Sequence, residues 1–229
     1  MNNIKKVWTV TKVNFRYSTW IAYLVTFICL LGGISNYITA KFVEQDNSIT
    51  SVGNYLYILC LMAPILLASI NYSKLMHIGV NKKTYLKSCI IIYVVFSAVV
   101  SLLDIVCYYF IDLPLESEIK QIFNLIKIFN WDTNVLTAFF CQFAFLFLLQ
   151  SVVHTLTFIQ TKWYGIMADV LIVAIISVFT PIAVLRQAEV FFFYMIIFIK
   201  PAIAQIGICL GLSALILWTN LFYMKRRNA

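Results

Sequence analysis

Charge is scarce in this sequence, and acidic charge is the scarcest. Only 11% of the 229 residues are charged, whereas about 25% is usual in soluble domains. Asp and Glu together number nine against seventeen Lys and Arg, and hydrophobic residues make up 62% of the chain. The mean hydropathy is +0.92. These proportions exclude an ordinary soluble fold and indicate an integral membrane protein.

The motifs of common hydrolytic enzymes are also missing. The sequence contains no G-x-x-x-x-G-K-[ST] phosphate loop, no H-E-x-x-H and no G-x-S-x-G, and its only histidines are His77 and His154. Its six cysteines are far apart and lack metal-ligand spacing, so we expect free packing residues. We therefore expect a chain that is not an enzyme, binds no metal and has no cofactor of its own.

The apolar residues form runs of about 20, long enough to cross ~30 Å of hydrocarbon as helices and too long for barrel strands. We predict an all-α polytopic membrane protein, a single transmembrane domain over 1–229. Before its first span, a basic amphipathic lead is predicted to be an elbow helix in the membrane interface at 2–18. Before its last span, about ten apolar residues are too few to cross and are predicted to be re-entrant, at 190–201. The six transmembrane helices are expected at 20–40, 55–72, 88–111, 133–159, 165–185 and 202–223.

Basic and acidic residues lie in different connecting segments. The segment 71–87 contains four lysines, one histidine and no acid, whereas the segments 41–53 and 112–132 hold six acids: Glu44, Asp46, Asp112, Glu116, Glu118 and Asp132. The positive-inside rule therefore places 71–87 and both termini in the cytoplasm, in a multi-pass protein of the cell membrane. We assign the net charge of +8 to contact with membrane lipids and not to nucleic acid. The apolar spacing over 117–129 predicts a short amphipathic helix on the outer surface.

Asp104 lies within the third predicted span, where placing a carboxylate in the hydrocarbon costs free energy. It should therefore face the bundle interior, a partner or water. It shares one helical face with three other polar residues by i, i+4, i+7, i+11 spacing, namely Ser97, Ser101 and Tyr108. Asp104 and Ser101 are thus candidates to line a polar pathway. The alternative is that Asp104 reaches only headgroups or a neighbouring tyrosine hydroxyl.

Other polar or small residues also fall inside spans. Gln150 and His154 share a face with Thr157 and Thr161, which favours hydrogen bonds between helices over a polar pathway or proton relay. Asp169 is expected to pair with Lys162 or another internal basic residue, with a relay role as the alternative. Gly207 and Gly211 form a G-x-x-x-G flanked by Ala204 and Ala214, a pattern that allows close helix packing within one subunit or between two.

Residues 78–86, I-G-V-N-K-K-T-Y-L, resemble the G-x-[S/N]-[R/K]-[K/R]-x-[Y/F] pattern that follows the second span in permease subunits of the ABC-2-type ABC transporter family. The predicted layout of nearly the whole chain is similar as well. The resemblance implies a dimer, taken here as two identical permease chains, that binds two separate ATPase subunits. ATP and Mg²⁺ would belong to those ATPase subunits. The chain departs from many members at Asn81 and Lys82, where they have Ser and Arg.

In that family the segment after the second span is a coupling helix seated on the ATPase. Carried over to this chain, the coupling residues would be Gly79, Lys82, Lys83 and Tyr85, with His77 on the same element. The short external loops resemble those of small exporter permeases, which implies ATP-driven export of an amphipathic peptide, an antimicrobial or a lipid-like substrate. The alternative function is a non-transporting membrane sensor or accessory subunit. The alternative for 71–87 is a basic loop that only sets topology and attracts anionic lipid.

Overall fold

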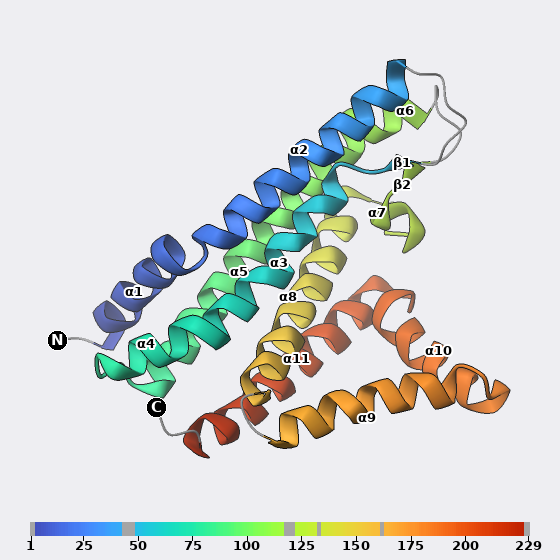
Figure 1. The fold of residues 1–229 in the computed structure, drawn as a ribbon. Coiled ribbons are helices and arrows are strands. Elements are labelled where there is room, and N and C mark those ends of the chain that lie inside the picture. Colours follow the sequence, from blue (N-terminus) through green and yellow to red (C-terminus); the bar gives the residue numbers. More distant parts are fainter. Residues whose placement is uncertain (1–2, 43–48, 117–121, 132–133, 161–162, 227–229) are drawn as a thin grey trace.

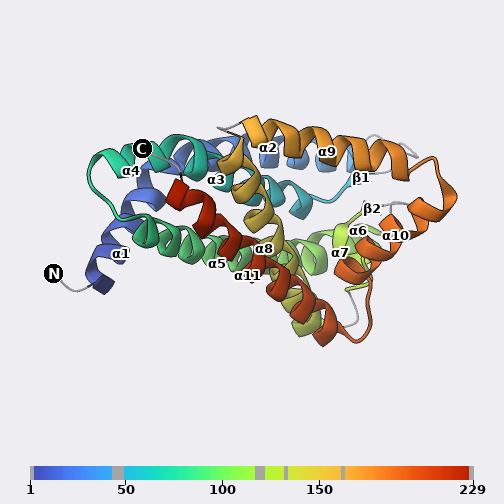
Figure 2. The ribbon, with the colours of Figure 1, turned by 90° about the horizontal axis from the view of Figure 1, so that it is seen from below.

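The computed structural model describes residues 3–42, 49–116, 122–131, 134–160 and 163–226. Across these ranges the fold is almost wholly helical, and its long helices form one bundle (Figure 1, Figure 2). Five helices are long and apolar enough to cross a membrane, and a bent pair of helices gives a sixth crossing if it is counted as one span. The chain is therefore an all-α polytopic membrane protein. Some residues used in the sequence predictions lie outside the described ranges: Glu44, Asp46, Glu118, Asp132, Thr161 and Lys162.

The N-terminal region forms two helices that meet at Thr19. α1 (Asn3–Val13) runs into a π-helical turn (Asn14–Ser18), and α2 (Trp20–Phe42) follows. α1 packs against α5, and its Ile4 and Trp8 side chains are exposed. A helix thus occupies the predicted 2–18 region, while its location in a membrane interface stays a prediction.

The second span is one continuous helical segment, Gly53–His77, with a change of winding in the middle. A 3₁₀ turn (Gly53–Leu56) leads into α3 (Tyr57–Leu66), a π-helical turn (Leu67–Asn71) and α4 (Tyr72–His77). Pro64 lies inside α3. A proline has no N–H to donate and its ring crowds the preceding turn, so local π winding after it is one way to accommodate it. The helix extends five residues beyond the predicted end at 72.

The third span is the longest helical segment, Lys82–Leu115 with 34 residues. It comprises α5 (Lys82–Cys107), a π-helical turn (Tyr108–Asp112) and α6 (Leu113–Glu116). At 1.5 Å per residue it is about 50 Å long, well beyond the ~30 Å of hydrocarbon. It therefore begins six residues before the predicted start at 88 and joins both ends of the bundle.

α8 (Val135–Ile159) lies at the centre of the bundle, where it contacts α3, α5 and α11 (Ala202–Arg226). Figure 1 places α1, α4 and the C-terminal end of α11 at one end of the bundle, here called the inner end. The opposite end, called the outer end, holds α6, α7 and two short strands. α8 has an unusually polar buried face, which the next subsection describes.

The outer end contains a small parallel sheet in place of the amphipathic helix expected over 117–129. β1 (Ile49–Thr50) pairs with β2 (Ile122–Phe123), and α7 (Leu125–Ile128) is a single turn. Asn124 separates β2 from α7, with extended backbone and a side chain that accepts a hydrogen bond from the Ile126 N–H. A single helix over this stretch is thus a wrong prediction for its described part, because Asn124 starts a new helix there.

The fifth predicted span is divided into two helices. α9 (Trp163–Phe179) and α10 (Ala183–Ile197) meet at an angle of 119°. Pro181 stands between them and disfavours continued helix at that point. In Figure 1, α9 runs away from the bundle and α10 returns toward its outer end. The expected continuous helix to 185 and short segment at 190–201 are therefore replaced by two helices of similar length, both largely exposed.

Candidate functional site: the 78–81 turn and the buried polar layers

The α4–α5 turn is closed by standard helix-capping interactions. Gly79 has φ +81, its N–H donates to the Met76 carbonyl at 3.0 Å, and the Val80 N–H donates to the Leu75 carbonyl at 3.0 Å. These two bonds form a Schellman motif, which ends a helix with a residue in the left-handed region, usually glycine. Val80 and Leu75 lie in the same hydrophobic cluster, as this motif favours.

Asn81 begins the next helix directly. Its side-chain oxygen accepts a hydrogen bond from the Lys83 N–H at 3.0 Å, and its backbone is extended. Ser and Asn are about equally good at this N-cap position, so Asn81 can do here what Ser would do. The predicted coupling element at 71–87 is thus two helix ends joined by a four-residue turn, with no separate helix.

The turn presents a basic surface with one apolar residue at its tip. Lys74, His77, Lys83 and Lys87 are exposed, and Lys82 is half-buried. Ile78 is 74% exposed, an unusual place for a large aliphatic side chain. Sequence reasoning missed Ile78, although its position directly before Gly79 was the available signal. Beside the turn, a cavity of about 350 Å³ is lined by Lys82 and Lys83 and by Trp218 and Phe222 of α11.

Tyr85 lies inside the bundle and not on the turn surface. It is fully buried, its hydroxyl donates to the Leu67 carbonyl at 2.7 Å, and its ring packs edge-to-face on Tyr72. Leu67 belongs to the π-helical turn, so Tyr85 joins α5 to the irregular part of the second span. Of the predicted coupling residues, only Tyr85 is removed from the surface.

The turn geometry predicts a cost for replacing Gly79. A Cβ at this residue would meet no atom within 4 Å, so the cost in Gly79→Ala is conformational only. We expect about 1 kcal/mol of destabilisation, or a fall in Tm of roughly 3 °C, in thermal unfolding of the purified chain.

Gly207→Ala is the matched control for that experiment, since its Cβ also meets open space and its backbone is helical. Gly79→Asn should lose less than Gly79→Ala, because asparagine tolerates positive φ better than alanine does. Equal stability of the alanine variant and the wild type would contradict the assigned motif.

Asp104 is fully buried near the outer end and is held by two neighbouring helices. Tyr57 of α3 donates its hydroxyl to Asp104 Oδ2 at 3.0 Å, and Gln142 of α8 donates its amide to the same oxygen and to the Tyr57 hydroxyl. The predicted contact with a tyrosine hydroxyl is therefore present. Asp104 Oδ1, Gln142 Oε1 and Ser101 Oγ are buried without a hydrogen-bond partner among the described residues.

A second buried carboxylate, Asp112, lies one layer further out. Its Oδ2 accepts hydrogen bonds from the Ser51 hydroxyl at 2.6 Å and from the Asn124 amide. Asn124 also donates to Ser51 Oγ at 3.1 Å. Sequence reasoning placed Asp112 in an external acidic segment and missed this layer. Its three residues come from segments 12 to 73 positions apart, and no local pattern could pair them.

The inner half of α8 carries Gln150 and His154, both fully buried against α5. Gln150 donates to Ser97 Oγ at 2.7 Å and to the Tyr93 carbonyl at 3.3 Å, and His154 Nδ1 shares a hydrogen bond with the Tyr93 hydroxyl. The favoured interpretation, hydrogen bonding between helices, is therefore confirmed for both residues. The helix face that four polar residues of the third span share is buried as well: Ser97, Ser101, Asp104 and Tyr108.

The remaining predicted site residues lie apart from these layers. Asp169 accepts a hydrogen bond from Gln160 at 3.0 Å, and its predicted partner Lys162 is outside the described ranges. Gly207 and Gly211 are exposed, and a Cβ on either would touch nothing within 4 Å. Close packing of this stripe inside the subunit is therefore wrong for the described part of the chain, because no helix lies over it.

The described residues offer no group of three His, Cys, Asp or Glu side chains that could hold a metal ion. All six cysteines are free. These ranges hold two buried carboxylates within hydrogen-bonded layers and a basic surface at the 78–81 turn. Comparison with protein-family models, with curated proteins and with solved structures finds no match to this chain.

Proposed function

We propose that this chain is the permease subunit of an ATP-driven exporter, and that a separate ATPase subunit docks on the 78–81 turn. The observation that carries the proposal is the construction of that turn. It is capped on both sides, it presents Lys83 and His77, and it places Ile78 at its tip. A tip that is both rigid and exposed loses little conformational freedom when it binds a partner.

The helices attached to the turn support the same proposal. α5 continues from Lys82 through 34 helical residues to the outer end, where Asp104 and Asp112 lie. Tyr85 also ties its first turns to Leu67 of the second span. A displacement of the turn would therefore move both helices together and reach the outer polar layers through one rigid segment.

The proposal extends to partners, location and substrate. Two copies of the chain would assemble with two ATPase subunits in the cell membrane, with both termini cytoplasmic and ATP and Mg²⁺ held by the ATPase. The uncovered stripe at Gly207 and Gly211 and the exposed α9 and α10 are surfaces on which the second copy could pack. The substrate class is an amphipathic peptide, an antimicrobial or a lipid-like molecule, in keeping with an apolar transmembrane bundle.

The test is retention of an ATPase subunit by the charge-reversed turn. The tagged chain is purified from its native host, and the amount of the co-purifying phosphate-loop ATPase subunit is measured. We expect the double variant Lys82→Glu/Lys83→Glu to retain at least about tenfold less ATPase, the effect of about 1.4 kcal/mol. Acidic residues are favourable in the first turn of a helix, so the reversal should leave α5 folded.

The matched control is Lys5→Glu/Lys6→Glu, which reverses two exposed lysines of α1 at the same inner end. It should retain the ATPase as the wild type does. Equal retention by the turn variant would contradict the proposal, and a chain that assembles stably without any ATPase would favour an accessory or sensory role.

A further inference from the structure

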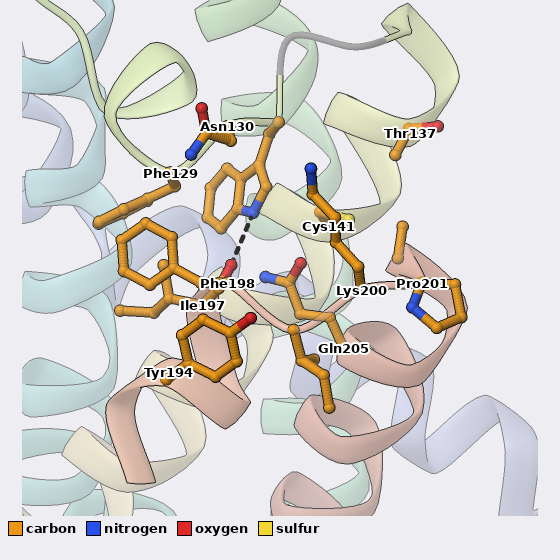
Figure 3. A pocket seen from close by; sticks show the side chains of 13 residues that line it. Phe129, Asn130, Thr137, Cys141, Tyr194, Ile197, Phe198, Lys200, Pro201 and Gln205 are labelled. Atoms are coloured by element: carbon orange, nitrogen blue, oxygen red, sulfur yellow. Dashed lines mark hydrogen bonds between the residues drawn. The ribbon is translucent and has the colours of Figure 1, made fainter. Parts of the chain in front are cut away.

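A cavity of about 380 Å³ opens at the outer end of the bundle, far from the 78–81 turn. It is enclosed by the segment after α7, the first turns of α8, the end of α10 and the start of α11. Figure 3 shows its lining side chains. Sequence reasoning assigned none of them to a binding site.

Aromatic rings form one wall of this cavity. Phe129 lies 4.9 Å from Trp131 and 5.8 Å from Phe198 between ring centroids, and Tyr194 stacks on Phe198 at 6.2 Å. The Trp131 indole N–H donates to the Ile197 carbonyl at 3.2 Å, which fixes that ring between α7 and α10. The wall is thus a preformed apolar surface suited to an apolar chain or ring.

Polar side chains also line the cavity, among them Lys200 and Gln205 (Figure 3). Lys200 is exposed and carries the only charge among the lining residues that the structure describes. Gln205 is 2% exposed, and its Nε2 has no hydrogen-bond partner within the described ranges. An unpaired buried amide is costly, and a ligand that brings an acceptor oxygen would satisfy it. The polar side of the cavity therefore offers a cation and a donor.

We propose that this cavity binds a single-chain anionic amphiphile, with the anionic group at Lys200 and Gln205 and the apolar chain along the aromatic wall. The volume is near the lower limit for small-molecule sites, which fits one chain and excludes a folded peptide. The ammonium group of Lys200 disfavours a cationic ligand. The cavity also lies beside the starts of α8 and α11, two helices long enough to cross a membrane, and lipid headgroups are expected at the ends of such helices. The proposal is independent of the ATPase.

The test measures lipid binding to the purified full chain in neutral detergent by native mass spectrometry. The probes share one 16-carbon chain: palmitate, lysophosphatidylglycerol and zwitterionic lysophosphatidylcholine. We expect one molecule of either anionic probe per chain, bound about tenfold more tightly than the zwitterionic probe. Lys200→Glu should remove this preference, and Gln205→Leu should weaken binding of both anionic probes.

Arg186→Glu is the matched control, because Arg186 is an exposed cation of α10 outside the cavity. It should bind the probes as the wild type does. A photoreactive palmitate should label residues 129–141 and 194–205 in the wild type.

Four results would overturn the proposal. The first is equal binding of all three probes, the second is an unchanged preference in Lys200→Glu, and the third is labelling elsewhere. Binding of a short apolar peptide with a free carboxylate, without binding of either anionic lipid, would also overturn it.

Discussion

Replacing Gly53 with alanine should destabilise the protein by about 3 kcal/mol, which corresponds to a fall in Tm of roughly 6–12 °C. A Cβ on Gly53 would stand 1.8 Å from Asp104 Oδ1 and 3.3 Å from the Asp104 Cα. Asp104 is buried and fixed through its other oxygen by Tyr57 and Gln142. It cannot move aside without breaking those bonds, so the new methyl group must push the 3₁₀ turn away from α5.

A double-mutant cycle separates this collision from a general effect of alanine. Asp104→Ala removes the two closest contacts, so Gly53→Ala should cost much less in that background than in the wild type. Gly32→Ala in α2 is the matched control, because a Cβ on Gly32 has no atom within 4 Å. This substitution should be neutral or stabilising. Thermal unfolding in detergent gives all four values. Additive effects in the cycle would show that Gly53 and Asp104 are not in contact.

The second large effect is expected at Tyr85. Tyr85→Ala should cost about 4 kcal/mol, because it leaves a large cavity beside Tyr72 in the hydrophobic cluster. Tyr85→Phe keeps the ring and removes the hydroxyl that donates to the Leu67 carbonyl, so about 1 kcal/mol is expected. Thermal unfolding of the purified variants measures both values.

Tyr85→Phe also distinguishes a positioning residue from a docking residue. The buried ring presents nothing to a partner, so under the proposed permease function this variant should retain the ATPase fully while ATP-dependent export falls. Tyr37→Phe, which changes a half-buried tyrosine of α2, should alter neither measurement. Loss of ATPase retention in Tyr85→Phe would show that the residue contributes directly to docking.

The sequence predicted helix positions well wherever apolar runs and helix faces carry the information. The i, i+4, i+7, i+11 spacing from Ser97 to Tyr108 identified a buried face, and the spacing of Gln150 and His154 identified another. Both predictions succeed because a polar residue in a long apolar helix can only turn inward.

Helix ends were predicted less well, for a physical reason visible at the inner end. The apolar run stops near 72 and resumes near 88, whereas the helix itself continues to His77 and resumes at Lys82. Hydropathy reports which residues suit lipid, while capping residues determine where the backbone leaves the helix. Gly79 and Asn81 carried that second kind of signal, and it was the better guide.

The outer layers could not be predicted from the sequence. Ser51 and Asn124 come from connecting segments and Asp112 from the outer end of the third span, and their contacts depend on the pairing of β1 with β2. The cavity at Lys200 likewise depends on how far α10 returns after the bend at Pro181. Tertiary arrangement, and not local propensity, decides both.

The π-helical turn at Leu67–Asn71 determines which face of α4, the helix that follows it, is turned toward the core. A π turn holds one residue more than an α-helical path of the same length, and one residue corresponds to about 100° of rotation. Wound as an uninterrupted α-helix, α4 would be turned by about that angle. Tyr72 and Leu75 would then leave the core that they now occupy. The direction in which Lys74 and His77 point is therefore fixed by the one extra residue in the π-helical turn, several residues before the 78–81 turn begins.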